Sequence, residues 1–368
     1  MISNKRQLYI CESVYQLFNA IVLRMTVFPD TPADVLLTEH TDFSQISVEL
    51  EKTGLFGAVL QPVCRPKQYI YYTAPPERQA DCLRDPEALI GTPLGTPYTD
   101  FFVPVDHIYA KLLYYQQLKR GHKPSVHFYE EGMRAYTIDI LKNEQENEPS
   151  AADDYGSDSF ALNIANHYLY VPELFSVQNI HYQLKPIPKI DPNNQKLKDM
   201  LTAIFSTGAL PEERFIFFEE SNFCDRQLTN DFQIFQSVAQ TLGKDNIIVK
   251  RHPRNTVDRF TPAGYRVMEG HGIPWEMQLL HHDISKKVLV TIVSTASVTP
   301  FFLFGKPVPT IHLKHLFMGK SFLLSDAPFS AFYNKMILYF NQKDRMIHLP
   351  QSIEEFDEII RYLNVYGF

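Results

Sequence analysis

The feature that most constrains the fold is an alternation between short apolar runs and longer amphipathic stretches, which occurs in both halves of the sequence. The apolar runs have the length of buried strands, and the stretches between them carry apolar residues at helical spacing. Strands that alternate with helices predict parallel sheets covered on both faces. We therefore expect an α/β fold.

The first half shows the alternation up to about residue 129 and is less regular beyond it. We expect strands at residues 8–11, 33–37, 57–63 and 125–129. We expect helices at residues 14–25, 43–52 and 106–120, with Ser13 capping the first of them. Residues 65–100 predict an irregular excursion, and the six acids of residues 143–158 indicate a solvated loop.

The second half repeats the pattern more regularly. Expected strands are at residues 214–218, 246–250, 265–268, 287–293 and 308–313, and expected helices at 231–242, 275–282, 297–304 and 353–363. Three prolines in a short stretch, Pro186, Pro188 and Pro192, indicate a linker between the halves. We expect a first domain at 1–185, a linker at 186–212, a second domain at 213–350 and a C-terminal helix at 351–368. Two such domains facing each other would form a central cleft at the carboxyl ends of their strands, where such sheets bind ligands.

Length and composition agree with this organisation. The 368 residues suit two domains of roughly 150 residues each. The net charge of −7 excludes a whole-protein basic field of the kind that binds nucleic acid. The four cysteines form no CxxC pair and no zinc pattern, which is typical of a reduced cytoplasmic protein. We expect neither a signal peptide nor a transmembrane helix, because no apolar stretch is long enough.

The first cluster of chemically capable residues follows the strand expected at 125–129. Glu130 and Glu131 precede Gly132 there. Adjacent acids at the edge of a sheet can supply a general base, and the glycine allows a tight turn and a close approach of substrate. The same acids could equally begin a helix, because acidic side chains favour that end of the helix dipole.

The second cluster follows the strand expected at 246–250. Lys250, Arg251, His252, Pro253 and Arg254 place one histidine among three cations, which is typical of an anion site. The proline restricts the backbone and favours an extended conformation at the histidine. An exposed basic turn is the alternative interpretation.

The third cluster lies between an apolar strand and a helix. Ser294, Thr295 and Ser297 offer hydroxyls at a helix start, where backbone N–H groups bind phosphate readily, although these residues could simply cap the helix. Glu276 lies between the second and third clusters. Its carboxylate could accept both hydroxyls of a ribose, or it could be an ordinary first-turn acid.

The order of these clusters resembles the bacterial sialyltransferases, which combine an acid-acid-Gly motif with a His-Pro motif on a GT-B fold of two Rossmann-like domains. The chain length and the opening segment at residues 9–17 look most like glycosyltransferase family 52, which includes lipooligosaccharide and capsule sialyltransferases. The likeness covers the whole layout, but only about ten residues carry it. Polysialyltransferases share both motifs.

The resemblance implies a role for each motif residue. Glu131, with Glu130 as the alternative, takes the position of the base that deprotonates the acceptor hydroxyl. His252 takes the position that contacts and protonates the phosphate of CMP. Glu276 matches the ribose-binding carboxylate, and the hydroxyl pair of Ser294 and Thr295 matches the phosphate-binding pair. Neighbouring residues are assigned to the nucleotide site with them: Lys250, Arg251, Pro253 and Ser297.

This chain departs from the family pattern in two ways. It has Glu-Glu where Asp is common, so the base would sit on a longer side chain, and Lys250 and Arg251 make the approach to His-Pro more basic. Because family members can draw the base from the second domain, Asp225 and Asp231 are the alternative candidates.

The resemblance implies an inverting sialyltransferase with CMP-sialic acid as donor substrate and a glycan acceptor, without metal or cofactor. The expected location is the cytoplasm, including the inner face of the membrane, and both peripheral membrane association and a homodimer stay open. Alternatives are a GT-B glycosyltransferase using another nucleotide sugar and a non-catalytic nucleotide- or sugar-binding module. A dehydrogenase lacks its GxGxxG here and a serine hydrolase its GxSxG.

Overall fold

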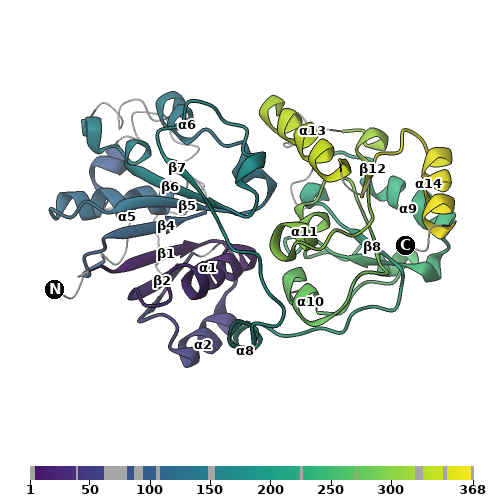
Figure 1. Cartoon of the computed structure of the whole chain (residues 1–368), viewed down its shortest axis with the longest axis horizontal. Coiled ribbons are helices and arrows are strands. Elements are labelled where there is room, and N and C mark those ends of the chain that lie inside the picture. The colour runs from purple at the N-terminus through teal and green to yellow at the C-terminus, as the bar shows by residue number, and fades with distance from the viewer. Residues whose placement is uncertain are drawn as a thin grey trace. The chain divides into compact units, whose positions relative to one another are not determined.

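The chain forms two compact α/β units (Figure 1). The computed structural model describes residues 5–38, 40–61, 81–86, 94–104, 108–147, 154–223, 227–270, 272–319, 326–342 and 346–365. The first unit comprises Met1–Pro188 and Asp199–Ile204, and the second comprises Lys189–Lys198 and Phe205–Phe368. Residues 186–212, expected as a linker, therefore divide between the units and contain a helix, α8 (Gln195–Ile204).

The first unit is built on a seven-stranded sheet in the order β3-β2-β1-β4-β5-β6-β7. All pairings between these strands are parallel. The strands are β1 (Gln7–Cys11), β2 (Ala33–Leu37), β3 (Val59–Leu60), β4 (Asp100–Val103), β5 (Ser125–Tyr129), β6 (Ile164–Leu169) and β7 (Gln183–Pro186). Within the described part of this unit, the helices include α1 (Val14–Thr26), α2 (Ser44–Thr53), α5 (Ile108–Lys119) and α6 (Ile140–Asn147).

Aromatic side chains fill much of the first core. Tyr9 on β1 stacks on Phe102 on β4 with ring centroids 4.5 Å apart, and both are fully buried. The expected cap of α1 is confirmed, since the Ser13 hydroxyl accepts the N–H of Gln16 and the Gln16 side chain accepts the N–H of Ser13. This reciprocal cap fixes the turn at the carboxyl end of β1.

The second unit is built on a five-stranded parallel sheet in the order β12-β11-β10-β8-β9. Its strands are β8 (Phe215–Phe218), β9 (Ile247–Lys250), β10 (Val288–Thr291), β11 (Thr310–His312) and β12 (Ile347–His348). Its helices among the residues that the structure describes include α9 (Asp231–Leu242), α10 (Trp275–His281), α11 (Thr299–Phe304), α13 (Ala327–Asn341) and α14 (Ile353–Val365). The predicted α/β fold class is therefore confirmed in both units.

Helices cover both faces of the second sheet (Figure 1). On one face Phe217 packs against Phe235 of α9, and Phe356 of α14 joins the same cluster. On the other face Phe218, the next residue of β8, meets Trp275 of α10 edge-to-face, because successive strand residues point to opposite sides. The C-terminal helix expected at 351–368 is thus part of the second unit.

Some elements differ from the sequence expectations. Strands β4, β6, β7 and β12 and helices α8 and α13 were not expected. Helix α6 occupies the start of the segment 143–158, which was expected to be a loop. Residues 265–268 form an isolated bridge from Val267 to Val249 rather than a strand. Much of the excursion expected at 65–100 lies outside the described residues.

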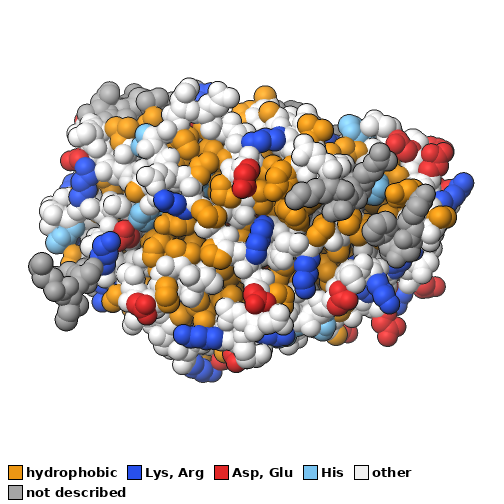
Figure 2. Space-filling view, viewed as in Figure 1, with side chains coloured by type: hydrophobic (Ala, Val, Ile, Leu, Met, Phe, Trp, Pro, Cys, Tyr) orange, Lys and Arg blue, Asp and Glu red, His pale blue; other side chains and the backbone are white. Residues whose placement is uncertain are grey.

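Charged side chains of both signs are interspersed on the face drawn in Figure 2, outside its grey residues. This distribution agrees with the modest net charge of the chain. None of the helices in the described residues is both long enough and apolar enough to cross a membrane.

Candidate functional site

Glu130, directly after β5, forms hydrogen bonds within the core of the first unit. Its side chain is fully buried, and one carboxylate oxygen accepts hydrogen bonds from the Tyr136 hydroxyl (2.5 Å) and from the N–H of Tyr170 (2.8 Å). The Asn19 side chain donates to the backbone carbonyl of Glu130 at 3.0 Å. These contacts tie the end of β5 to α1 and to the segment after β6, so Glu130 is poorly placed to contact a substrate.

Glu131 differs from its neighbour because its side chain is only partly buried. Burial raises the pKa of Glu131 to about 7, with a contribution in the same direction from Glu12 and an opposing one from Arg134. A carboxylate that titrates near neutral pH can accept a proton effectively. Gly132 follows with a φ of 123°, which turns the chain away from β5.

Gln16 connects Glu131 to the end of β1. Its side-chain oxygen accepts the N–H of Glu12 (2.7 Å), and its side chain donates a hydrogen bond to the Glu131 carboxylate, which acts to lower the pKa of that group. The carboxyl ends of β1 and β5 are separated only by β4. Glu12 directly follows β1, and Gln16 lies in the first turn of α1. Neither residue was given a role from the sequence, although both lie in the opening segment at residues 9–17.

His252, after β9, is held at its backbone and at its ring. Its N–H donates to the Glu219 carboxylate at 3.0 Å. The N–H of Arg254 donates to Nδ1 of the imidazole at 3.2 Å. Because Nδ1 accepts this bond, the ring proton of the neutral imidazole is on Nε2. His252 is partly exposed and Pro253 is exposed.

The cations beside His252 serve different purposes. Lys250 donates from Nζ to the carbonyl of Ile273 at 3.0 Å, and Arg251 donates to the carbonyl of Asn255. Burial lowers the pKa of Lys250. Arg254 is exposed. The structure therefore engages Lys250 and Arg251 within the protein, whereas both were predicted to contact the nucleotide.

Glu276 lies in the first turn of α10 and is 6 % exposed. Burial raises the pKa of Glu276 to about 7, and the nearby Lys250 opposes the shift. The carboxylate is therefore close to its titration point at neutral pH. This placement is compatible with a carboxylate that binds a ligand and with an ordinary acid in the first turn of a helix.

The sequence left two interpretations for the segment after β10, a phosphate site and a simple helix cap, and the structure is compatible with both. Ser294 caps a short 3-10 helix, Thr295–Ser297, with its hydroxyl accepting the N–H of Ala296 at 3.4 Å, and Ser294 and Thr295 are partly exposed. Ser297 is 2 % exposed. Its hydroxyl contacts the carbonyl of Ser294 at 2.7 Å and Nε2 of His312 at 2.9 Å. Ser297 therefore acts within the core rather than at a surface that a nucleotide could reach.

The alternative bases in the second unit fare differently. Asp231 is 5 % exposed and pairs through both oxygens with the Arg259 guanidinium. Burial acts to raise the pKa of Asp231, but the Arg259 hydrogen bonds and charge lower it overall, which disfavours a role as base. Asp225 lies outside the described residues.

Sequence reasoning missed two acids directly after β8, Glu219 and Glu220. They follow the buried run of β8 as Glu130 and Glu131 follow β5, so the same signal was present. Their contacts reach the segment of His252, which follows β9, and the segment of Ser294, which follows β10. Strands β9 and β10 lie on either side of β8.

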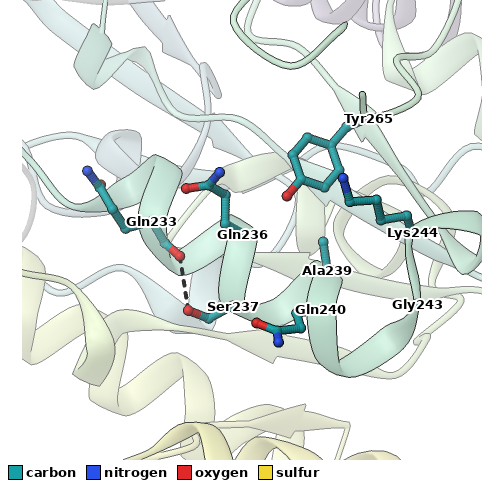
Figure 3. Close-up of a pocket in the computed structure, with 8 residues that line it drawn as sticks. All are labelled: Gln233, Gln236, Ser237, Ala239, Gln240, Gly243, Lys244 and Tyr265. Atoms are coloured by element: carbon teal, nitrogen blue, oxygen red, sulfur yellow. Dashed lines mark hydrogen bonds between the residues drawn. The ribbon is translucent and has the colours of Figure 1, made fainter. Parts of the chain in front are cut away.

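A separate surface pocket of about 580 Å³ lies beside α9 (Figure 3). The residues that line it are Gln233, Gln236, Ser237, Ala239, Gln240, Gly243, Lys244 and Tyr265. Gly243 and Lys244 precede β9, so this end of the pocket is near the amino ends of the strands, away from His252. Among the described residues no group of three or more His, Cys, Asp or Glu could hold a metal ion.

The chain matches no protein-family model and no curated protein. It is similar in structure to the Arabidopsis thaliana protein UGT89C1 complexed with UDP, with a TM-score of 0.50 and 13% identity over 99% of this chain and 91% of that chain. An α/β-galactoside α-2,3-sialyltransferase from Photobacterium phosphoreum gives a TM-score of 0.49 at 12% identity over 94% and 99%. A sialyltransferase GT-B domain from Photobacterium damselae gives 0.44 at 14% over 94% and 99%. The chain has the GT-B fold of two Rossmann-like units.

Proposed function

We propose that this protein is an inverting glycosyltransferase that moves sialic acid from CMP-sialic acid to a galactose-type hydroxyl of a surface glycan, such as lipooligosaccharide or capsule. The order of the motifs along the chain supports this donor. Acid-acid-Gly at residues 130–132 precedes the His-Pro pair at 252–253, Glu276 and the hydroxyl pair at 294–295, as in the sialyltransferases that the sequence resembles.

The observation that carries the proposal is the contrast between Glu130 and Glu131. The Glu130 carboxylate accepts hydrogen bonds from within the protein, whereas Glu131 is partly exposed and has a pKa of about 7. A base for a sugar hydroxyl has to be ionised at working pH and still hold a proton well, and Glu131 meets both conditions. We assign it as the base that removes the proton of the acceptor hydroxyl.

The reaction is a single displacement. The acceptor oxygen bonds to the anomeric carbon of sialic acid while the bond from that carbon to the CMP phosphate breaks, and the transition state has oxocarbenium character. The hydroxyl proton passes to Glu131, and the bonding electron pair leaves with the phosphate. His252 would donate a hydrogen bond from Nε2–H to the departing phosphate, and Ser294 and Thr295 would add further donors.

A neutral imidazole suits this departing group. A phosphate monoester gains little from full protonation near its second pKa of about 6, so a fixed hydrogen bond is sufficient. The Arg254 N–H at Nδ1 keeps the opposite nitrogen protonated and able to donate. Glu276 would accept hydrogen bonds from the ribose hydroxyls of CMP.

The alternative with independent support is a GT-B glycosyltransferase that uses another nucleotide sugar, because a UDP complex shares the fold. Thermal unfolding with CMP, UDP, GDP and ADP in excess separates these functions. A nucleotide at 100 times its Kd adds about 2.7 kcal/mol, which shifts the midpoint by several degrees. Stabilisation by CMP alone supports the sialic acid donor. A shift with UDP or GDP instead replaces the donor, and a shift with none favours a different kind of protein.

A further inference from the structure

Glu219 and Glu220 connect three neighbouring strand ends of the second unit. Strand β8, which they follow, pairs with β9 on one side and with β10 on the other. All three strands are parallel, so their carboxyl ends lie at the same edge of the sheet. Residues after β8 can therefore reach both the segment of His252 and the segment of Ser294.

Glu219 uses both of its carboxylate oxygens. One accepts the backbone N–H of His252 at 3.0 Å, and the other accepts Nε of Arg259 at 3.1 Å. The side chain is 1 % exposed, so both bonds form away from water and their loss would be costly.

Arg259 is itself fixed. Its guanidinium pairs with Asp231, the first residue of α9, and lies over the rings of Phe223 and Phe260 at 4.9 and 5.3 Å. The carboxylate of Glu219 is therefore held by a cation that cannot easily move. A connected series of charges thus links the start of α9 to the backbone of His252.

Glu220 supports the opposite side. One of its oxygens, Oε1, accepts both the Thr291 hydroxyl (2.9 Å) and the N–H of Val293 (2.8 Å), which lead into Ser294. Its backbone carbonyl accepts the Asn255 side chain at 3.0 Å, and the N–H of Asn255 donates to the carbonyl of His252. Burial raises the pKa of Glu220, although the residue as a whole is only partly buried.

We propose that Glu219 and Glu220 are positioning residues of the donor site: Glu219 fixes His252, and Glu220 fixes the segment of Ser294 and Thr295, in the geometry that receives the CMP phosphate. The part played by the phosphate rests on the proposed function, whereas the two contacts themselves do not. Misplacing a catalytic group by about 1 Å can cost about 100-fold in rate.

The two acids differ in a way that a conservative substitution can detect. Glutamine retains one acceptor oxygen, so Glu220→Gln can keep both bonds at Oε1, whereas Glu219→Gln must lose one of its two partners. We expect Glu219→Gln to lower kcat about 10- to 100-fold with little change in the KM for donor. Glu220→Ala should raise the donor KM, and Glu220→Gln should restore it.

The matched control is Glu213, at the other end of the same strand. It is 7 % exposed and pairs with Arg266 at 2.9 Å, so Glu213→Gln removes a comparable charge far from the donor site. Equal losses of kcat in Glu213→Gln and Glu219→Gln, at matched thermal stability, would assign Glu219 a structural role only. Equal losses in Glu220→Gln and Glu220→Ala would overturn the role of Glu220.

A spectroscopic measurement tests the Glu219 contact without any substrate. Labelling with ¹⁵N-histidine gives 13 backbone amide signals, and His252→Gln identifies the signal of residue 252. We expect this amide proton to lie downfield in the wild type and to move upfield in Glu219→Ala, which removes both acceptor oxygens, but not in Glu213→Ala. An unmoved signal overturns the proposal even if CMP-sialic acid is turned over. A moved signal without such turnover retains the contact and refutes the proposed function.

Discussion

The backbone N–H of Arg254 donates a hydrogen bond to Nδ1 of His252, with 3.2 Å between the two nitrogens. This bond leaves Nε2 as the protonated nitrogen of the neutral ring. A neutral ring with its proton on Nε2 can donate a hydrogen bond to the departing phosphate. The family resemblance implied instead that His252 transfers a proton to it.

The first prediction concerns the atom that acts in His252. The side-chain nitrogen of glutamine reaches approximately where Nε2 lies, whereas that of asparagine is closer to Nδ1. His252→Ala should lower kcat by about 10²- to 10⁴-fold, and His252→Gln should retain more activity than His252→Asn. Steady-state rates measure the order. An asparagine variant more active than the glutamine variant would place the functional nitrogen at Nδ1.

The second prediction is a pH dependence set by Glu131. Burial raises the pKa of this carboxyl to about 7, and only its ionised form can accept a proton. Under the proposed function, kcat/KM should therefore rise with pH, reach half its maximum near pH 7 and level off above it. Glu12→Gln removes a charge that raises this pKa, so the rise should move to lower pH. A rise centred near pH 4.5 in the wild type would contradict the assignment.

Glu276 gives a third prediction, in which stability and binding change in opposite directions. Its pKa is raised in the folded protein to about 7, so stability falls as pH increases from the unfolded value near 4.5 through 7. Glu276→Gln removes this cost and should raise the thermal midpoint more at pH 8 than at pH 5. It should also weaken CMP binding by about 10-fold or more, because a charged hydrogen-bond acceptor is lost. Unchanged CMP affinity in a calorimetric titration would remove Glu276 from the ribose site.

A fourth prediction concerns His167 on β6, to which the proposed function assigns no role. It is fully buried beside the rings of Phe128, Phe175 and Tyr182, and neither ring nitrogen has a hydrogen-bond partner among the described residues. Burial lowers its pKa to about 3, so the stability it contributes is present above pH 6.5 and is lost as the pH falls toward 3. His167→Phe should therefore gain more stability at pH 5 than at pH 8. Thermal unfolding curves with the same difference at both pH values would show that His167 is not neutral in the fold.

The fifth prediction concerns metal ions. The proposed donor carries a single phosphate, and the proposed reaction uses hydrogen-bond donors rather than a cation to stabilise it. Transfer should therefore continue at an unchanged rate in excess EDTA. Loss of activity that added Mg²⁺ or Mn²⁺ restores would argue for a different class of glycosyltransferase.

The second unit could be predicted from sequence more completely than the first. Strands β8, β9 and β10 are continuous apolar runs, which is typical of parallel strands buried on both faces. Strand β6 instead reads Ile-Ala-Asn-His-Tyr-Leu, and β7 contains a proline at its end, so neither gives a strong strand signal. Helix α13 is apolar on several sides, which weakens its helical periodicity.

The sequence predicted where the candidate residues lie along the chain, but not which of them has a structural role and which is exposed. The pattern of two acids after a strand identified Glu130 and Glu131 together, and only the contacts with Tyr136 and Tyr170 separate the buried acid from the partly exposed one. The same pattern at residues 219–220 was overlooked, because no neighbouring glycine or histidine marked it. Ser297 differs from Ser294 because its hydroxyl contacts His312 in the core. His312 is distant in sequence, so this contact could not be predicted.

The most direct test of the central claim is transfer from CMP-sialic acid to a panel of galactose-terminated acceptors that includes lactose, with CMP release and sialylated product both measured. We expect the wild type to form product, and Glu131→Gln to lose about 10²- to 10⁴-fold of the rate while keeping its CMP affinity. No turnover of CMP-sialic acid on any acceptor, together with turnover of a UDP- or GDP-linked sugar, would contradict the sialic acid donor. Full activity in Glu131→Gln would contradict the assignment of the base.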